Sequence, residues 1–95
     1  MKILSIARAR LGVSQQQIGE LMRDEASRAW ELYEQNIIRE IYVLQDRPGV
    51  VTVFECASLD EVKQISQSFP LVQKGLIEFD FMVLGPFTNY AKLFT

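Results

Sequence analysis

The residue with the clearest chemical signal in the sequence is Glu25. Residues 15–35 contain no proline, and their apolar side chains recur on one face at 100° per residue, which predicts a long helix. The apolar stripe consists of Ile18, Leu21, Met22, Ala29, Leu32 and Tyr33. Glu25 falls in the middle of this stripe, and burial without a partner raises the pKa of a carboxyl group toward the range of a general base. Alternatively, Glu25 forms a structural ion pair with Arg8 or Arg39, or lies where the stripe overhangs the sheet edge.

Arg39, Tyr33 and Tyr42 are further candidates for a site. Arg39 interrupts the apolar face of a strand predicted at 37–45, so it either stabilises an oxyanion in a pocket or pairs with a strand carboxylate. Each tyrosine either donates a phenolic hydrogen bond into a cavity or packs with its hydroxyl group satisfied. The sequence contains no histidine, so acid and base chemistry would have to use carboxylates, tyrosine or lysine.

The sequence offers no cofactor or metal site. Cys56 is the only cysteine and sits in a run of Val and Phe, which predicts a buried thiol. Glu55, Glu78 and Asp80 are the only closely placed strand acids, and a solvated strand edge explains them more simply than a metal ion. No glycine-rich phosphate loop or serine-centred elbow is present. We therefore expect a cofactor-independent protein.

Composition also excludes two classes of partner. The formal net charge is −2 and the basic residues are scattered, so the chain lacks the basic patch that nucleic acid requires. No apolar run reaches the roughly 18 residues of a membrane-spanning helix. The N-terminal residues 1–9 have a strand-like pattern instead of a charged leader with a cleavage site. We expect a cytoplasmic protein.

The order of the elements predicts a ferredoxin-like α+β fold. Strands are predicted at residues 1–9, 37–45, 50–57 and 76–84, and helices at 15–35 and from the Ser58 cap to about residue 68. Ser14 and Ser58 are expected N-caps, Glu61 completes a capping box, and Asn36 tolerates the left-handed conformation after the first helix. The βαββαβ order places both helices on one face of a four-stranded antiparallel sheet, in a single domain of residues 1–95.

The second face of this sheet needs a cover. Hydrophobic residues make up 48% of the chain, more than a thin two-layer domain can hide. The expected apolar residues of the second face are Leu4, Ile6, Tyr42, Phe54, Met82 and Leu84. Packing against the sheet of a second copy would bury them in a dimeric α+β barrel. Trp30 is expected to anchor a subunit contact, and Tyr90, Leu93 and Phe94 in a C-terminal segment too short for an independent helix could attach to a partner.

The chain resembles the muconolactone isomerase-like family over nearly its whole length. The resemblance rests on the order and spacing of Asp24-Glu25, Ala29, Leu32, Arg39, Tyr42, Val53-Phe54-Glu55, Ser58, Pro70-Leu71, Ile77-Glu78, Asp80 and Pro86. It implies a ferredoxin-like fold, dimers or larger rings, and cofactor-free proton transfer within an unsaturated lactone. Glu25 would be the base, Arg39 and Tyr42 would stabilise the oxyanion, and Tyr33, Glu40 and Phe54 are candidates for substrate contacts.

One departure from the family pattern concerns Glu40, which stands where the enzymes of aromatic degradation have histidine. A second acid changes the charge of the pocket, so the substrate is expected to differ or to be bound without turnover. Two other functions therefore stay open. One is a non-catalytic ligand-binding or assembly module, and the other is a cofactor-free monooxygenase of the same fold.

Overall fold

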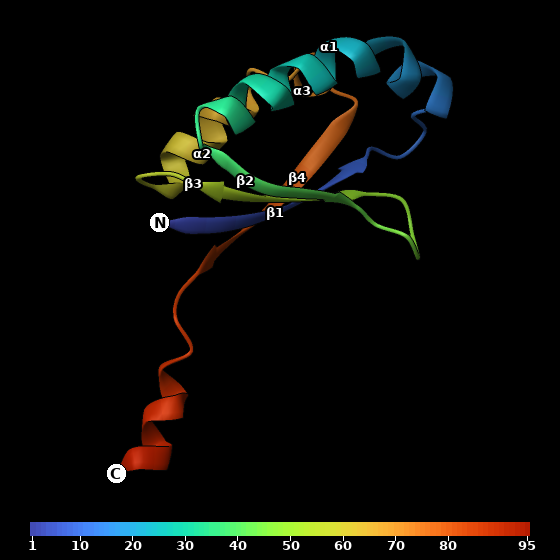
Figure 1. Ribbon diagram of the computed structural model, residues 1–95. Helices are drawn as coiled ribbons and strands as arrows, with labels where there is room; N and C mark the ends of the chain where they lie inside the picture. The colour runs from blue at the N-terminus through green and yellow to red at the C-terminus, as the bar shows by residue number, and fades with distance from the viewer.

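The computed structural model describes residues 1–95 and contains a single four-stranded sheet with helices on one side (Figure 1). The elements, in chain order, are β1 (Lys2–Ala9), α1 (Gln15–Glu34), β2 (Ile38–Val43), β3 (Val50–Glu55), α2 (Leu59–Ser66), α3 (Pro70–Gln73), β4 (Ile77–Leu84) and the 3₁₀ helix η1 (Thr88–Phe94). No helix has the length and the apolar character needed to cross a membrane.

Local hydrogen bonds set the ends of the two longer helices. At the start of α1, Ser14 Oγ accepts from Gln17 N–H at 3.2 Å and Gln17 Oε1 accepts from Ser14 N–H at 2.9 Å, which is a complete capping box. Asn36 follows α1 with φ of 63°, the left-handed conformation predicted for it. At the start of α2, Ser58 Oγ accepts from Glu61 N–H, while the Glu61 carboxylate accepts from Ala57 N–H. The predicted helix starts are therefore confirmed.

The sheet has the strand order β2-β3-β1-β4, and all neighbouring strands are antiparallel. Helices α1, α2 and α3 lie above one face, and the other face has no helix over it (Figure 1). This confirms the predicted ferredoxin-like α+β fold. In the register, Ile3 pairs with Phe54 and Val83, and Leu4 pairs with Val53 and Met82. Odd-numbered residues of β1 therefore face the helices, whereas Leu4 and Ile6 face the uncovered side, which we call the open face.

Phe54 was expected on the open face, and this expectation is wrong. Its Cα partners Ile3 and Ile38 both face the helices, and the Phe54 side chain is 1% exposed. The assignment failed because the face depends on the pairing register: Val50, Thr52 and Phe54 pair with Ala7, Ser5 and Ile3, so the even positions of β3 face the helices. A bulge at Arg39 also shifts the register of β2, so Ile41 and Val43 face the helices, and Tyr42 faces the open side.

The helix-covered core consists of two hydrophobic clusters. The first cluster contains Ile3, Leu32, Ile38, Phe54, Cys56, Val62 and Phe69. The second cluster contains Ala7, Leu71 and Ile77. Cys56 is buried among apolar residues, and desolvation raises the pKa of its thiol, in line with the structural thiol that the sequence predicts.

Two short helices were not predicted. Phe69-Pro70 ends α2 as expected, but Pro70 then occupies the first turn of α3, where its missing N–H costs nothing. The C-terminal segment was expected to be too short for a helix, yet Thr88–Phe94 forms η1. This helix extends away from the sheet on the side opposite α1 (Figure 1).

Candidate functional site

Glu25 lies in the middle of α1 and turns toward α3. Its Oε1 atom accepts a hydrogen bond of 2.9 Å from the backbone N–H of Leu71, and the side chain is half-buried. Desolvation raises the pKa of the carboxyl group, and the bond from Leu71 opposes this only in part. Oε2 has no hydrogen-bond partner in the chain, although it is not among the fully buried atoms. This oxygen is therefore free to accept a proton from a ligand or from water.

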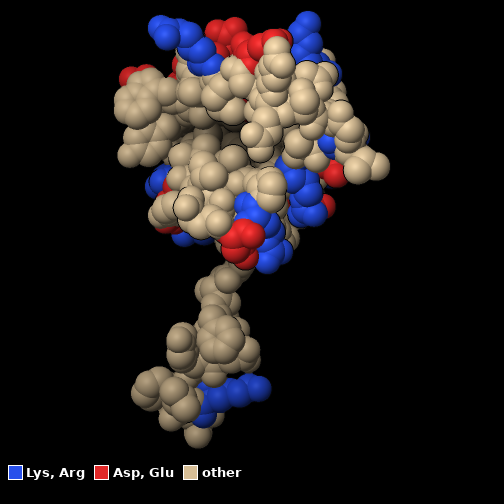
Figure 2. Space-filling model, turned by 90° about the vertical axis from the view of Figure 1, so that its right-hand side faces the viewer, with Lys and Arg blue, Asp and Glu red and all other residues tan.

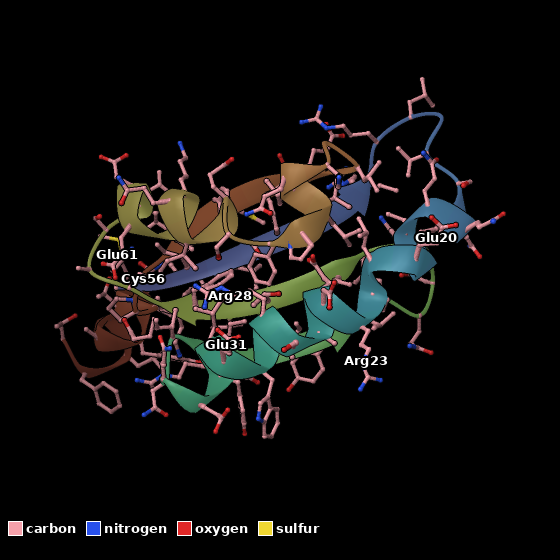
Figure 3. All side chains as sticks on the ribbon, turned by 90° about the horizontal axis from the view of Figure 1, so that it is seen from above. Glu20, Arg23, Arg28, Glu31, Cys56 and Glu61 are labelled. Atoms are coloured by element: carbon pink, nitrogen blue, oxygen red, sulfur yellow. The ribbon has the colours of Figure 1, made fainter.

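No cation neutralises Glu25, so the expected ion pair with Arg8 or Arg39 is wrong. Arg8 pairs with Asp80 at 3.1 Å, and Arg39 Nε donates to the carbonyl of Asn36 at 2.8 Å. Arg28, three residues after Glu25 on α1, lies between the two rows of helices (Figure 3). Its guanidinium donates to Ser68 Oγ and pairs with Glu31 at 2.9 Å. Only the N–H of Leu71 offsets the desolvation of the Glu25 carboxylate, and this fits an available base better than a structural ion pair.

Glu25 marks the boundary between the two core clusters. Along α1, Leu21 packs against the second cluster, and Leu32 belongs to the first. Along β1, Ala7 belongs to the second cluster and Ile3 to the first. Ser5 lies between them, so it marks the same boundary on the sheet.

Two hydroxyl groups on the sheet line this boundary. Ser5 pairs with Thr52 across the strands β1 and β3, so both side chains face the helices, and both are buried. Ser5 Oγ is the one buried side-chain polar atom in the chain with no hydrogen-bond partner. We refer to Glu25, Ser5 and Thr52 as the polar seam. A buried hydroxyl without a partner is uncommon in proteins and has a free donor for a ligand.

Arg39, Glu40 and Tyr42 lie elsewhere. Tyr42 Oη donates to Glu40 Oε1 at 2.9 Å on the open face, and this bond to Glu40 is the main cause that raises the pKa of the tyrosine. The donor of Tyr42 is therefore already engaged. Arg39 lies at the bulge beside Glu55, whose pKa is lowered mainly by a hydrogen bond from the N-terminal amino group and to a smaller extent by Arg39. Within one chain, the sheet separates Tyr42 and Glu40 from Glu25.

The remaining two predicted residues differ in exposure. Phe54 is enclosed in the first cluster, where it packs between the sheet and the helices. Tyr33 is half exposed on α1, and its ring lies 5.4 Å from the ring of Trp30. Thus, of the six predicted site residues, only Glu25 lies at the boundary between the two core clusters.

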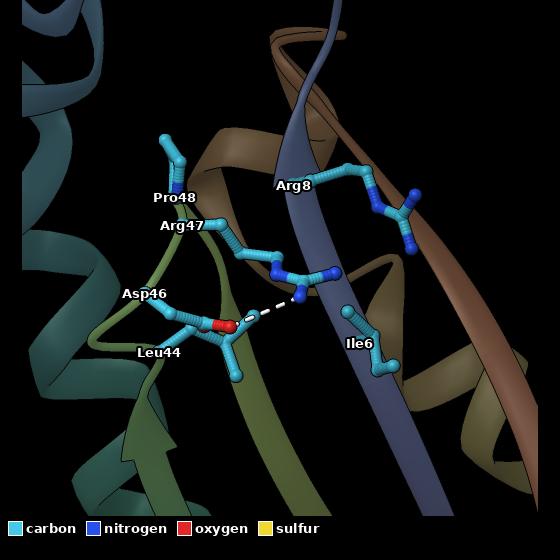
Figure 4. Close-up of a pocket in the computed structure, with 6 residues that line it drawn as sticks. All are labelled: Ile6, Arg8, Leu44, Asp46, Arg47 and Pro48. Carbon is cyan, nitrogen blue, oxygen red and sulfur yellow. Dashed lines mark hydrogen bonds and ion pairs between the residues drawn. The ribbon is translucent and has the colours of Figure 1, made fainter.

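Two hollows of the chain are separate from the seam. One, of about 150 Å³, is lined by Arg8, Glu78, Phe79 and Asp80. The other, of about 290 Å³, lies at the β2–β3 turn on the open face and is lined by Ile6, Arg8, Leu44, Asp46, Arg47 and Pro48 (Figure 4). The arginines of this second hollow have acidic partners, since Arg47 pairs with Asp46 at 3.0 Å and Arg8 with Asp80. We therefore assign no anion-binding role to it.

Sequence reasoning missed Ser5 and Thr52. The sequence analysis assigns only Leu4 and Ile6 of residues 1–9 to a face, and Ser5 stands between Ile3 and Ala7 on the opposite face. A period-two pattern with a single hydroxyl among inward-facing apolar residues is the signal that could have found it.

Comparisons with known proteins show which solved structures share this fold. Neither a protein-family model nor a curated protein sequence matches the chain. Among solved structures, 5-chloro-2-hydroxyhydroquinone dehydrochlorinase (TftG) from Burkholderia phenoliruptrix AC1100, solved with 2,5-dihydroxybenzoquinone, superposes with a TM-score of 0.75 and 19% identity over 90% of this chain and 94% of that one. Muconolactone isomerase superposes with a TM-score of 0.67 and 18% identity over 93% of this chain and 94% of that one. An uncharacterized NIPSNAP domain protein from Burkholderia xenovorans has a TM-score of 0.51 at 14% identity, over 92% of this chain and 97% of that one.

At these identities the comparisons establish the fold. The first two proteins have the α+β fold of the dimeric α+β barrel proteins. The chain therefore has the fold of muconolactone isomerase and of the dimeric α+β barrel proteins, which confirms the resemblance drawn from the sequence.

Proposed function

We propose that the protein is a cofactor-independent, isomerase-like enzyme that transfers a proton within a small unsaturated lactone or a related conjugated carbonyl compound. The observation that carries this proposal is the state of Glu25: half-buried, without a cation, and with Oε2 unoccupied. Burial raises the pKa of this carboxyl group above its ordinary value, which is the direction that favours a general base. Two fold neighbours act on small molecules, one of them an isomerase, and this supports the same class of substrate.

In the proposed reaction, Glu25 Oε2 removes the proton from a carbon next to the conjugated system. The electron pair of the broken C–H bond enters the conjugated system and forms a dienolate. The protonated Glu25 then returns the proton to a different carbon, so the product is an isomer and no oxidant is consumed.

The rest of the polar seam supplies the second half of this chemistry. The negative charge of a dienolate collects on the carbonyl oxygen, and donors held in a region with little water stabilise it best. Ser5 Oγ has no partner to give up, and Thr52 lies beside it on β3. We assign these hydroxyl groups to the carbonyl oxygen, in place of the engaged Tyr42 and the distant Arg39.

The active assembly is proposed to be a homodimer whose open faces pack together. Tyr42, Met82 and Leu84 are exposed on this face of the isolated chain, and Leu4 and Ile6 are only half-buried. An apolar surface of this kind is costly in water. A twin sheet would cover it and would place Glu40 and Tyr42 at the interface instead of in the catalytic site.

Replacement of Glu25 by Gln tests the function directly. Glu25→Gln keeps the size of the side chain and an oxygen for Leu71 N–H, but it removes the base. Exchange of substrate protons for deuterium, followed by NMR on a panel of butenolides in D₂O, should slow by about 100-fold or more.

The matched control is Glu40→Gln, which makes the same chemical change on the open face. It should leave the exchange rate unchanged. Equal rates in wild type and Glu25→Gln would remove Glu25 from the mechanism, and no exchange of any panel member by the wild type would contradict the substrate class.

One observation favours a second function, a non-catalytic module that binds a small molecule or serves assembly. Glu25 lines neither of the two hollows, and the chain does not bring Arg39 or Tyr42 to it. A butenolide that binds equally well to wild type and to Glu25→Gln, without proton exchange in either, would support this second function.

A further inference from the structure

The C-terminal arm, which we define as residues 85–95, has no surface of its own to pack on. Its four large apolar side chains Phe87, Tyr90, Leu93 and Phe94 are between 64% and 86% exposed, and no residue of η1 is buried. The arm stands clear of the rest of the chain, which makes the molecule 55 Å long but only 29 Å and 20 Å across (Figures 1 and 2). A 3₁₀ helix of seven residues is not stable alone in water, so the arm needs a partner surface.

A second unpaired apolar surface lies between α1 and the edge strand β2. Ile41 and Val43 face the helix layer, since they pair with Thr52 and Val50, yet they stay 46% and 66% exposed. The helix layer therefore covers Ile38 but not the Ile41–Val43 end of β2.

The flank of α1 next to β2 is apolar too. At 100° per residue, Met22 and Tyr33 lie on the flank of Glu25 opposite to Arg28. Because Arg28 contacts Ser68 before α3, this opposite flank faces β2. Met22, Tyr33 and the adjacent Trp30 are all exposed. We refer to Met22, Trp30, Tyr33, Ile41 and Val43 as the α1–β2 edge.

The arm of a chain cannot easily reach the α1–β2 edge of the same chain. It leaves β4 on the side of the open face, and the edge lies on the helix side of the sheet (Figure 1). In a dimer with packed open faces, however, the arm points toward the twin subunit. Four extended residues and seven 3₁₀ residues span roughly 27 Å, which exceeds the roughly 20 Å of a sheet-to-sheet spacing plus one helix layer.

We infer that the two subunits exchange arms: the arm of each chain docks on the α1–β2 edge of the other, with its apolar side chains over Ile41 and Val43. This inference rests on the proposed dimer. Arm exchange accounts for both exposed apolar surfaces. The apolar side chains of each arm become buried on the partner subunit, and they cover the part of the α1–β2 edge that the helices leave exposed.

Cross-linking between two differently tagged chains tests the inference. One chain carries Leu93→Cys and the other Ile41→Cys, and a short bis-maleimide joins thiols that lie close together. Both positions are exposed in the isolated chain, so the variants should fold, and the buried Cys56 should not react. A cross-linked heterodimer is the expected result.

The matched control replaces Lys63 instead of Ile41. Lys63 is exposed on α2, away from both the α1–β2 edge and the open face, so the proposed dimer leaves it accessible. Leu93→Cys should react with Ile41→Cys at least tenfold faster than with Lys63→Cys, since only the first pair lies on the docking surface. Equal rates, a faster reaction with Lys63→Cys, or a cross-link between Leu93→Cys and Ile41→Cys within one doubly substituted chain at high dilution would each overturn arm exchange.

The solution mass separates this inference from the dimer on which it rests. A dimeric mass without the Leu93–Ile41 cross-link overturns the exchange and leaves the dimer standing, whereas a monomeric mass overturns both. Trp30 gives an independent signal, because it is the only tryptophan and lies on the α1–β2 edge. Its fluorescence should be quenched more strongly by iodide in Leu93→Asp than in wild type, and equal quenching would contradict docking at this edge.

Discussion

The open face of the sheet and the polar seam both contain polar side chains, but these side chains have side-chain partners on the open face and lack them in the seam. On the open face, acids have partners: Asp80 pairs with Arg8, Asp46 pairs with Arg47, and Glu40 accepts from Tyr42. In the seam, Glu25 has only a backbone donor and Ser5 has no partner.

The difference shows where polar groups are held for a ligand. Exposed ion pairs cost little desolvation energy and contribute little to stability, so their presence says little about function. A polar group within an apolar layer is retained against its desolvation cost, and the lack of a partner leaves it available. The seam, and not the more numerous charges of the open face, is therefore the candidate site.

The largest expected effect tests the assignment of the two faces. Phe54→Ala removes a side chain from the first cluster and should lower the free energy of unfolding by about 3–5 kcal/mol, through lost burial and a cavity. Met82→Ala changes the open face, and its effect should be smaller and should grow with protein concentration, because Met82 lies in the proposed interface. Urea denaturation at two protein concentrations measures both. A Phe54→Ala loss below about 1 kcal/mol would place Phe54 outside the core.

A smaller effect compares two buried serines. Ser66 Oγ donates to the carbonyl of Val62 at 2.8 Å, whereas Ser5 Oγ has no partner. Ser66→Ala should lower the free energy of unfolding by about 1 kcal/mol. Ser5→Ala should raise it by up to about 1 kcal/mol, because the unsatisfied hydroxyl is removed. The same variant should slow proton exchange on the butenolide panel. Losses of equal size in both variants would show that Ser5 has a structural partner.

The pH dependence of stability isolates Glu25. Its pKa is raised above the ordinary value of 4.5, so the folded chain keeps a proton that the unfolded chain has already lost. The unfolded state binds fewer protons in this window, so the free energy of unfolding falls as pH rises from 4.5 through the raised pKa. Glu25→Gln cannot lose this proton and should gain stability relative to wild type over the same window. A relative loss would contradict the raised pKa.

Much of the fold could be predicted from the sequence because local signals agree with each other. Ser14 and Ser58 mark helix starts through bonds within four residues, and Asn36 marks a helix end through its own backbone. The prediction that Met82 and Leu84 of β4 lie on the uncovered face is correct.

The site was less predictable, because its geometry depends on register and on distant contacts. The bulge at Arg39 has no local sequence signal, and it separates Arg39 from the strand face assumed for it. The donor to Glu25 is a backbone N–H 46 residues away, which no side-chain pattern reveals. The inward position of Glu25 could be predicted from helical periodicity, but its lack of a cation could not.

The most direct test of the central claim is the pKa of Glu25 in the folded protein. A ¹³C NMR titration of the glutamate side-chain carboxyl carbons can measure it, with the resonance assigned by its absence in Glu25→Gln and compared with the urea-unfolded chain. An unpaired carboxylate within the seam predicts a midpoint clearly above 4.5 and above the value in urea. A midpoint at or below 4.5 would show that Glu25 is solvated or paired, and would contradict its role as the base.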